Sequence, residues 1–382
     1  MTPPQPIETI PTPATRVITR IDRVSGLSLE DRRRIAPVAK RFRFQAPSYY
    51  LSRIRWDDPA DPLRRIVVPD PGEDDTTGRL DPSNERSNTV LPGLQHKYRD
   101  TVVVLLTDRC AGLCRYCFRK RLFMQDEGEC LQDVGVAVAY VERHPEVTDV
   151  LLTGGDPLTL PTERLAAAAL AFASIPHVRT IRLGSKTPAY NPLRVLEDPA
   201  LPELVRALHA RGKAVALMSH FDHPAELGPE ARRCIAAFQE AGAQVLNQCP
   251  LIRGVNDDSS VLADLYRELV GLGITPYYLF QMRPAVGNRV YAVPIVEGWQ
   301  ILSRARRRLS GLARRVRYAM SHATGKVEIL GVDDRSIYAR YHRARAPEDE
   351  DRVLVLPRDD RALWLDELWE QEEPPEGDAA AA

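Results

Sequence analysis

The stretch TVVVLLTDRCAGLCRYCFRKR, residues 101 to 121, determines the fold and the chemistry that we expect of this chain. Its first seven residues are apolar or β-branched, which predicts a buried strand. Cys110, Cys114 and Cys117 follow in the loop after that strand, spaced C-x3-C-x2-C. Three thiolates are one fewer than the four that usually hold an iron–sulfur cluster, so one iron would stay open to a small molecule. The loop therefore predicts a reactive 4Fe–4S cluster.

Two other interpretations of the three cysteines are open. Positions i, i+4 and i+7 share one helix face, so three buried cysteines of a core helix would give the same spacing. Against this, residues 109 to 121 include five basic side chains and no acidic one, a setting that lowers thiol pKa values and favours ligating thiolates. A zinc site would need a fourth ligand, and no second Cys/His pair is spaced for it. The other cysteines, Cys130, Cys234 and Cys249, are expected to be plain buried thiols.

The composition excludes several classes of protein. The 382 residues include 52 acidic and 52 basic ones, so no net charge draws the chain to nucleic acid or to a membrane surface. No apolar run reaches the length of a membrane span, and the proline-rich N-terminus lacks the apolar core of a signal peptide. With three cysteines assigned to a reduced cluster, a cytoplasmic location is expected.

Short apolar runs alternate with helical stretches from residue 101 onward, which predicts an α/β fold of parallel β/α units. Strands are expected at residues 101–107, 148–154, 180–185, 214–220, 244–250, 275–281 and 314–320, and helices at 131–143, 162–174, 199–211, 228–241, 259–271 and 297–310. Such units suggest a partial parallel barrel with its site at the C-terminal ends of the strands. We expect an irregular and helical N-terminal region (1–95), a core (96–330), and a C-terminal extension with an acidic tail (331–382). In that tail, LWLDELWEQEE is either a docking helix or a solvated segment.

The cysteine motif resembles that of the radical S-adenosylmethionine (SAM) superfamily, whose aromatic residue before the last cysteine is matched by Tyr116. In that superfamily the open iron is held by the amino and carboxylate groups of SAM. Gly154, Gly155 and Asp156, directly after the second expected strand, resemble the segment that holds the SAM amino group; a tight turn with a capping aspartate is the other interpretation. Ser185, in RLGSKTP, resembles the stretch near the SAM carboxylate.

Within that superfamily, residues 45 to 330 resemble the lysine 2,3-aminomutases. The segments SYYLSRIRWDDPADPLRRIVVPD and LNQCPLIRGVND carry this resemblance. It implies that Gln248 contacts SAM and that Arg119, two residues after the cluster motif, binds the substrate α-carboxylate. Family members that bind zinc carry further cysteines after the second segment, whereas this chain has none after Cys249, so no zinc is expected.

The same resemblance implies that a lysine after a glycine-rich turn carries pyridoxal phosphate (PLP) as a Schiff base. Lys326 follows Gly325, just past the last expected strand. An exposed surface lysine is the other interpretation. We set the remaining five lysines aside because they occupy helices, precede the first strand or adjoin the cluster and SAM segments: Lys40, Lys97, Lys120, Lys186 and Lys213. We expect Arg317 and His322 to lower the pKa of Lys326, as Schiff-base formation requires.

The chemistry implied by the family is an isomerisation, in which a 5′-deoxyadenosyl radical lets the α-amino group of a PLP-bound amino acid move to the β-carbon. Where the lysine enzymes place an aspartate for the substrate ε-ammonium, this chain has Arg283. Arginine repels an ammonium and attracts a carboxylate, so the expected substrate is glutamate or another acidic amino acid.

Several alternatives to this function remain open. Arg283 could turn away or bind the PLP phosphate, with free or protein-bound lysine as the substrate. The chain could also be a radical SAM enzyme without PLP, or a non-catalytic cluster protein. The expected partners are the small-molecule amino acid and a reducing electron donor of the flavodoxin or ferredoxin type, with neither nucleic acid nor membrane; a homo-oligomer is left open.

Overall fold

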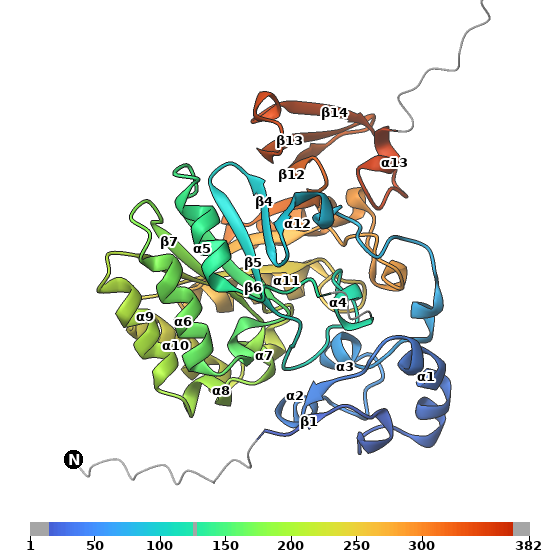
Figure 1. Cartoon of the computed structure of the whole chain (residues 1–382). Coiled ribbons are helices and arrows are strands. Elements are labelled where there is room, and N and C mark those ends of the chain that lie inside the picture. The colour runs from blue at the N-terminus through green and yellow to red at the C-terminus, as the bar shows by residue number, and fades with distance from the viewer. Residues whose placement is uncertain (1–14, 125–127, 370–382) are drawn as a thin grey trace, which may run out of the picture.

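The computed structural model describes residues 15–124 and 128–369, and a single large sheet runs through most of them (Figure 1). Its strand order is β14-β13-β12-β11-β10-β9-β8-β7-β6-β5-β4-β3. Strands β5 to β11 are parallel, and the pairs toward both edges are antiparallel. The fold is thus mixed α/β with a parallel-rich sheet, as the alternating sequence pattern predicted.

The strands of the sheet fall where the apolar runs lie. All seven expected strands are present, and β5 has the bounds that the sequence indicated. The bounds are β3 (Thr89–Leu91), β4 (Leu94–Tyr98), β5 (Thr101–Thr107), β6 (Asp149–Gly154), β7 (Thr180–Ser185), β8 (Ala214–Ser219), β9 (Gln244–Pro250), β10 (Thr275–Phe280), β11 (Arg317–His322), β12 (Gly325–Val332), β13 (Ser336–Ala344) and β14 (Val353–Pro357).

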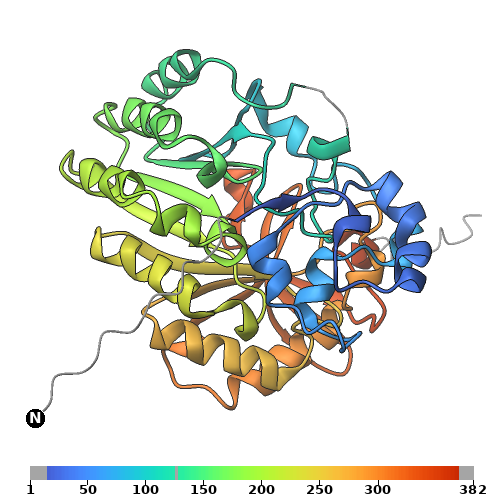
Figure 2. The ribbon, with the colours of Figure 1, turned by 90° about the horizontal axis from the view of Figure 1, so that it is seen from below.

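Helices connect the parallel strands and cover one side of the sheet. They are α5 (Val134–Glu142), α6 (Thr162–Ala173), α9 (Ala200–His209), α10 (Pro229–Glu240), α11 (Ser259–Gly271) and α12 (Ile295–Arg306). Neighbouring pairs such as α5 and α6, α6 and α9, and α11 and α12 are in contact, and Figure 2 shows these helices in an arc outside the strands. The other side of the parallel strands is left free to form a site.

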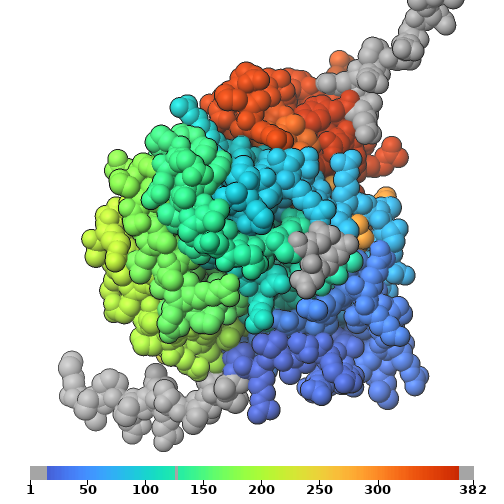
Figure 3. Space-filling view, viewed as in Figure 1, coloured from blue at the N-terminus to red at the C-terminus, as the bar shows by residue number. Residues whose placement is uncertain are grey.

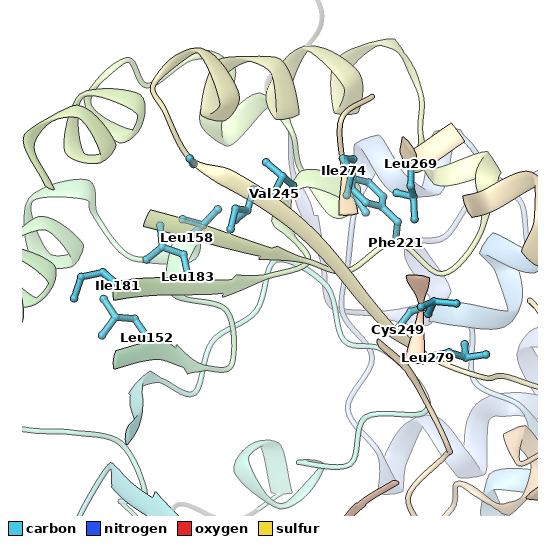
Figure 4. Close-up of a cluster of buried hydrophobic side chains, with 14 of the residues drawn as sticks. Leu152, Leu158, Ile181, Leu183, Phe221, Val245, Cys249, Leu269, Ile274 and Leu279 are labelled. Carbon is cyan, nitrogen blue, oxygen red and sulfur yellow. The ribbon is translucent and has the colours of Figure 1, made fainter. Parts of the chain in front are cut away.

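The main core lies between the sheet and these helices. Leu152, Ile181 and Leu183 are almost completely buried there, together with Leu269 of α11 and Leu279 of β10 (Figure 4). Burying one such side chain contributes about 1.5–3 kcal/mol. Side chains of a strand alternate between the two faces of the sheet. In β6 the residues next to Leu152, which are Leu151 and Thr153, therefore point away from this core.

The N-terminal region forms a second, smaller core that packs against the loops after the strands. Its helices are α1 (Leu29–Arg41), α2 (Ser48–Ser52) and α3 (Pro62–Val67), and two short strands pair there, β1 (Val17–Ile18) and β2 (Ala46–Pro47). Tyr50 and Ile66 of this region are buried with Tyr116 of the cysteine loop and Tyr190. In Figure 3 the N-terminal residues (blue) and the C-terminal strands (red) lie at opposite ends of the molecule.

The C-terminal extension differs from expectation because it continues the sheet. We expected no strand after residue 320, but β12, β13 and β14 extend the sheet beyond β11. Of the segment LWLDELWEQEE, residues 363–369 are described and include α13 (Asp366–Trp369); the last part of the expected acidic tail, residues 370–382, lies outside the described residues. Among the residues that the structure describes, no helix has both the length and the apolar character to cross a membrane.

Candidate active site

A single cavity of about 340 Å³ collects every site residue that the sequence predicted. These residues are Cys110, Cys114, Cys117, Arg119, Gly154, Gly155, Asp156, Ser185, Gln248, Arg283 and Lys326. Most of them stand at or just after the C-terminal ends of parallel strands, on the side of the sheet that faces away from the helices. The size is within the range of small-molecule sites, which is about 300–1,000 Å³.

The three cysteines form the part of the cavity nearest the N-terminal region. Within the described ranges no three acidic, cysteine or histidine side chains converge on one metal-ion position. A cluster does not require such convergence, because each thiolate binds a different iron of the cluster. The chemistry of the donor set, three free thiols in one loop lining one cavity, therefore fits a cluster with one open iron.

The basic residues of the cysteine loop do not act on the thiols as expected. Burial raises the pKa of all three thiols, that of Cys114 to about 12. The positive charges nearby are neutralised by acidic residues distant in sequence: Arg115 pairs with Glu73 at 2.8 Å and Arg121 with Glu85 at 2.8 Å. The predicted lowering of the thiol pKa values is wrong for the metal-free protein, and iron binding must displace thiol protons.

The two glycines at the end of β6 allow the cysteine loop to pack against that strand. Gly154 has φ +120°, and a Cβ there would lie 2.3 Å from the Thr107 carbonyl oxygen. A Cβ on Gly155 would lie 2.3 Å from the Arg109 carbonyl oxygen. The amide of Gly155 donates to Thr107 O at 2.6 Å, and that of Asp156 to Arg109 O at 2.7 Å. Only glycine permits this close approach of backbones.

The Asp156 carboxylate is occupied by hydrogen bonds within the protein. It accepts from the Ser185 hydroxyl at 2.8 Å and from the amides of Leu158 (3.0 Å), Lys186 (2.9 Å) and Thr187 (2.9 Å). Asp156 thus acts as a capping aspartate in a tight turn, which was the other interpretation of this segment. Its hydrogen bonds also connect the ends of β6 and β7. Direct contacts of Asp156 and Ser185 with SAM stay predictions. Gln248 differs, because its amide lines the cavity and makes no hydrogen bond to any described residue.

Arg119 is held in the cavity by an acidic residue that the sequence did not reveal. Its Nε and Nη2 donate to the Glu85 carboxylate at 3.0 and 2.8 Å, and its Nη1 donates to Gly154 O at 3.3 Å. Burial opposes ionisation of Glu85, but Arg119, Arg283 and Arg121 together keep its pKa well below the usual range. Glu85 begins a short 3-10 helix (Glu85–Asn88) just before β3, where no motif marks it.

Arg283 is partly buried, and one of its nitrogens lacks a hydrogen-bond partner among the described residues. Its guanidinium carbon lies 3.6 Å from the centre of the Phe118 ring, and its Nη1 is 3.8 Å from Glu85. That Nη1 is buried without a hydrogen bond to any part of the chain that the structure describes. Burial lowers the pKa of Arg283 to about 10. A partly buried guanidinium with an unmet donor can bind an anion that enters the cavity.

Lys326 lies at the start of β12, opposite Ser321 of β11, and not in a turn after the last strand. Its Nζ is 4.6 Å from the centre of the Tyr278 ring and makes no hydrogen bond or ion pair with any described residue. Its pKa is lowered to about 7, first by burial and then by neighbouring cations: Arg182, Arg283, Lys97 and Arg343. At neutral pH a substantial fraction of this amine is unprotonated, as a nucleophilic lysine requires.

The expected cause of the lowered pKa was wrong. Arg317 contacts His342 instead, and His322 bonds to Asp366 at 2.8 Å. Gly325 was expected in a phosphate-binding turn. Instead it allows β12 to approach β13 closely, because a Cβ there would lie 2.3 Å from the backbone of β13. The sequence located the lysine correctly in the cavity but not the charges that act on it.

Lys97 was set aside by position, yet it lines the same cavity. Burial, followed by the charge of Arg283, lowers its pKa to about 7 as well. Its Nζ donates to the backbone carbonyl of His322, whereas the Nζ of Lys326 has no hydrogen-bond partner among the residues that the structure describes. The position of β4 beside β5 in the sheet could not be inferred from the sequence pattern around Lys97.

The chain is similar over most of its length to known aminomutases. It is 48% identical over 342 residues to a protein of Aquifex aeolicus whose name, L-lysine 2,3-aminomutase, is provisional; the match covers 89% of this chain and 91% of that protein. It is 35% identical to the L-lysine 2,3-aminomutase of Clostridium subterminale (75% and 68% covered). It is 30% identical to the glutamate 2,3-aminomutase of Clostridioides difficile (78% and 70% covered).

These similarities place the chain among radical-dependent isomerases. It belongs to the lysine 2,3-aminomutase family of the radical SAM superfamily, with a 4Fe–4S cluster, SAM and PLP as cofactors. The alternatives without PLP or without catalysis are therefore set aside. No protein-family model matches the chain. A solved structure of a radical SAM methyltransferase from Sphaerobacter thermophilus is 23% identical with a TM-score of 0.39 and covers 59% of this chain and 68% of its own, too distant to support an argument.

Proposed function

We propose that this chain is a 2,3-aminomutase acting on glutamate or a similar acidic amino acid. The observation that carries the proposal is Arg283, which lines the cavity and whose Nη1 makes no hydrogen bond to any residue that the structure describes. By the family resemblance it stands where lysine enzymes carry an aspartate for the substrate ammonium. A partly buried cation at this position favours a side-chain carboxylate and disfavours an ammonium.

The cofactors fit the residues that line the cavity. Cys110, Cys114 and Cys117 would hold the cluster, Gln248 with the Gly154–Gly155 backbone would face SAM, and Lys326 would hold PLP. When bound, the cluster and SAM supply a 5′-deoxyadenosyl radical, and PLP supplies the π-system through which the nitrogen moves. The chain's own part is to hold these groups and the substrate in one dry cavity.

Charges around Lys326 suit an anionic cofactor. Lys97, Arg182 and Arg343 are neighbouring cations that lower the pKa of Lys326. Arg182 and Arg343 each have an acidic partner, Asp149 at 2.6 Å and Asp100 at 2.7 Å. A PLP phosphate among these cations would be stabilised by them while Lys326 stays neutral enough to bind the cofactor.

Arg119 is suited to the substrate α-carboxylate, although Glu85 holds it in the absence of substrate. Three guanidinium groups share this single carboxylate, those of Arg119, Arg121 and Arg283, and of these Arg119 and Arg283 line the cavity. The pair can therefore accept a further carboxylate without leaving an uncompensated charge. A dicarboxylate would place one carboxylate near each arginine, while Glu85 keeps both side chains in place.

The alternative is a lysine 2,3-aminomutase acting on free or protein-bound lysine. The 48% identity to the Aquifex aeolicus protein favours it. It requires that the lysine ammonium meet Glu85, a carboxylate already bonded to Arg119 and Arg121. For that reason the acidic substrate is the preferred proposal.

Further parts of the proposal concern organisation and partners. The parallel strands would act as a partial barrel within residues 96–330, with residues 1–95 as an N-terminal region and residues 331–382 as a C-terminal extension. A reducing protein of the flavodoxin or ferredoxin type would supply the electron, and a homo-oligomer is compatible with this organisation. A cytoplasmic location follows from the need to keep the thiols reduced.

The test is an anaerobic assay of reconstituted protein with dithionite, SAM, PLP and one amino acid at a time. Glutamate, aspartate, lysine and a lysine-containing protein substrate would be compared, with β-amino acid products identified by mass spectrometry. The proposal predicts β-glutamate as the main product. Formation of β-lysine alone would establish the alternative.

A further inference from the structure

A tyrosine hydroxyl lies against one of the three cluster cysteines. Tyr190 Oη is 3.0 Å from Cys114 Sγ, and Tyr190 itself is only 1% exposed. A thiolate bound to iron carries no proton, so in the loaded protein the hydroxyl must be the donor and the sulfur the acceptor. Hydrogen bonds to the sulfurs are among the features that set the reduction potential of a cluster.

The ring of Tyr190 is fixed in place by its neighbours. It ends the short helix α7 (Thr187–Tyr190) and packs edge-on against Tyr50, with 4.7 Å between ring centres. Lys186 Nζ lies 5.1 Å from the ring centre, and its ammonium is held by acidic partners in the interior. Gly112 of the cysteine loop faces the ring, and a Cβ there would lie 3.2 Å from the ring carbons. The loop and the ring are therefore fitted to each other.

We propose that Tyr190 is a positioning residue that raises the reduction potential of the cluster through its hydrogen bond to Cys114. Reduction adds negative charge to the ligating sulfurs, so the donor stabilises the reduced cluster more than the oxidised one. The electron that begins the reaction is then easier to deliver. This proposal rests on the cluster and is independent of the substrate.

The test compares Tyr190→Phe with Tyr50→Phe in anaerobically reconstituted protein. Tyr50→Phe removes a hydroxyl from the adjacent ring, where it donates to Glu226 at 2.8 Å and not to a cysteine. Potentiometric titration followed by electron paramagnetic resonance gives the cluster potential without any turnover. The cluster of the Tyr190→Phe protein should have a reduction potential about 59 mV more negative than that of the wild type, which corresponds to about a tenfold change in the equilibrium for one electron. Its iron content should be unchanged. Tyr50→Phe should stay near the wild-type value.

A potential for Tyr190→Phe equal to that of the wild type would overturn the proposal, as would an equal shift in Tyr50→Phe. If Tyr190→Phe does not assemble a cluster, site-specific replacement of Tyr190 by trifluorotyrosine decides. This nearly isosteric residue has a more acidic hydroxyl that donates more strongly. It should raise the potential above that of the wild type, and a lowered or unchanged potential would contradict the inference.

Discussion

Two lysines with lowered pKa values face the same cavity, and only one of them has a free amine. Lys97 Nζ donates to a backbone carbonyl, whereas Lys326 Nζ lies over the Tyr278 ring with no hydrogen-bond partner in the described chain. We predict that borohydride reduction fixes PLP on Lys326, as located by peptide mass mapping. Lys326→Arg should remove the label and the PLP absorbance, and the matched Lys97→Arg should keep both. Label on Lys97 would show that the assignment is wrong.

The pKa of Lys326 also predicts how PLP capture depends on pH. The amine must be neutral to react, and its pKa is lowered from 10.5 to about 7 by burial and neighbouring cations. The capture rate should therefore rise between about pH 6 and about pH 8 and then level off, in the protein with Lys97→Arg as well. Stopped-flow absorbance measures this rate. A rate that keeps rising toward pH 10.5 would mean that the amine is not held as described.

Arg283 determines the predicted choice of substrate. Arg283→Met removes a partly buried cation that lines the cavity, and it should lower kcat/KM for glutamate by about tenfold to a hundredfold, because a charge-assisted hydrogen bond contributes about 1.5–3 kcal/mol. Turnover of lysine should not fall. The exposed Arg307→Met is the control for a general loss of positive charge. Equal losses on both amino acids would show that Arg283 supports the fold and not specificity.

At the scale of the elements, the junction of β5, β6 and the cysteine loop depends on two glycines. Gly154→Ala introduces a Cβ 2.3 Å from a carbonyl oxygen at a positive φ, so it should destabilise the metal-free protein by about 1–3 kcal/mol. Gly271→Ala at the end of α11 meets nothing within 4 Å and should be neutral or slightly stabilising. Thermal unfolding followed by circular dichroism measures both. A Gly154→Ala protein as stable as the wild type would contradict this account of the junction.

The sequence predicted the elements that bury continuous apolar runs and missed those that do not. Strands β5 to β10 follow such runs, and β11 was expected from a more charged segment, RRVRYAM. Strand β13 alternates charged with apolar residues in SIYARYHRA, and the apolar β14 (VLVLP) leaves Val353 and Val355 mostly exposed, so only the edge of an existing sheet makes these segments strands. Lys326 therefore lies in a strand, although its place in the chain suggested a loop after the last strand.

At the scale of the whole molecule, the residues of the site could be predicted where a motif or a resemblance marks them, as for the three cysteines, Arg119 and Lys326. Glu85 and Lys97 could not be, because their place in the cavity depends on how the segment before β5 folds over the sheet. The pKa values could not be predicted either. Burial and distant acidic partners, such as Glu73 beside Arg115, outweigh the charges adjacent in sequence.

The central claim, an aminomutase for acidic amino acids, is tested most directly by internal competition. Isotopically labelled glutamate and lysine at equal concentration would be supplied together to the anaerobic holoenzyme, and the ratio of β-glutamate to β-lysine formed would give the ratio of their kcat/KM values. A partly buried Arg283 opposite the side chain predicts a ratio of about a hundred or more in favour of glutamate, since each 1.4 kcal/mol corresponds to about tenfold. A ratio below one, with β-lysine as the main product, would contradict the account.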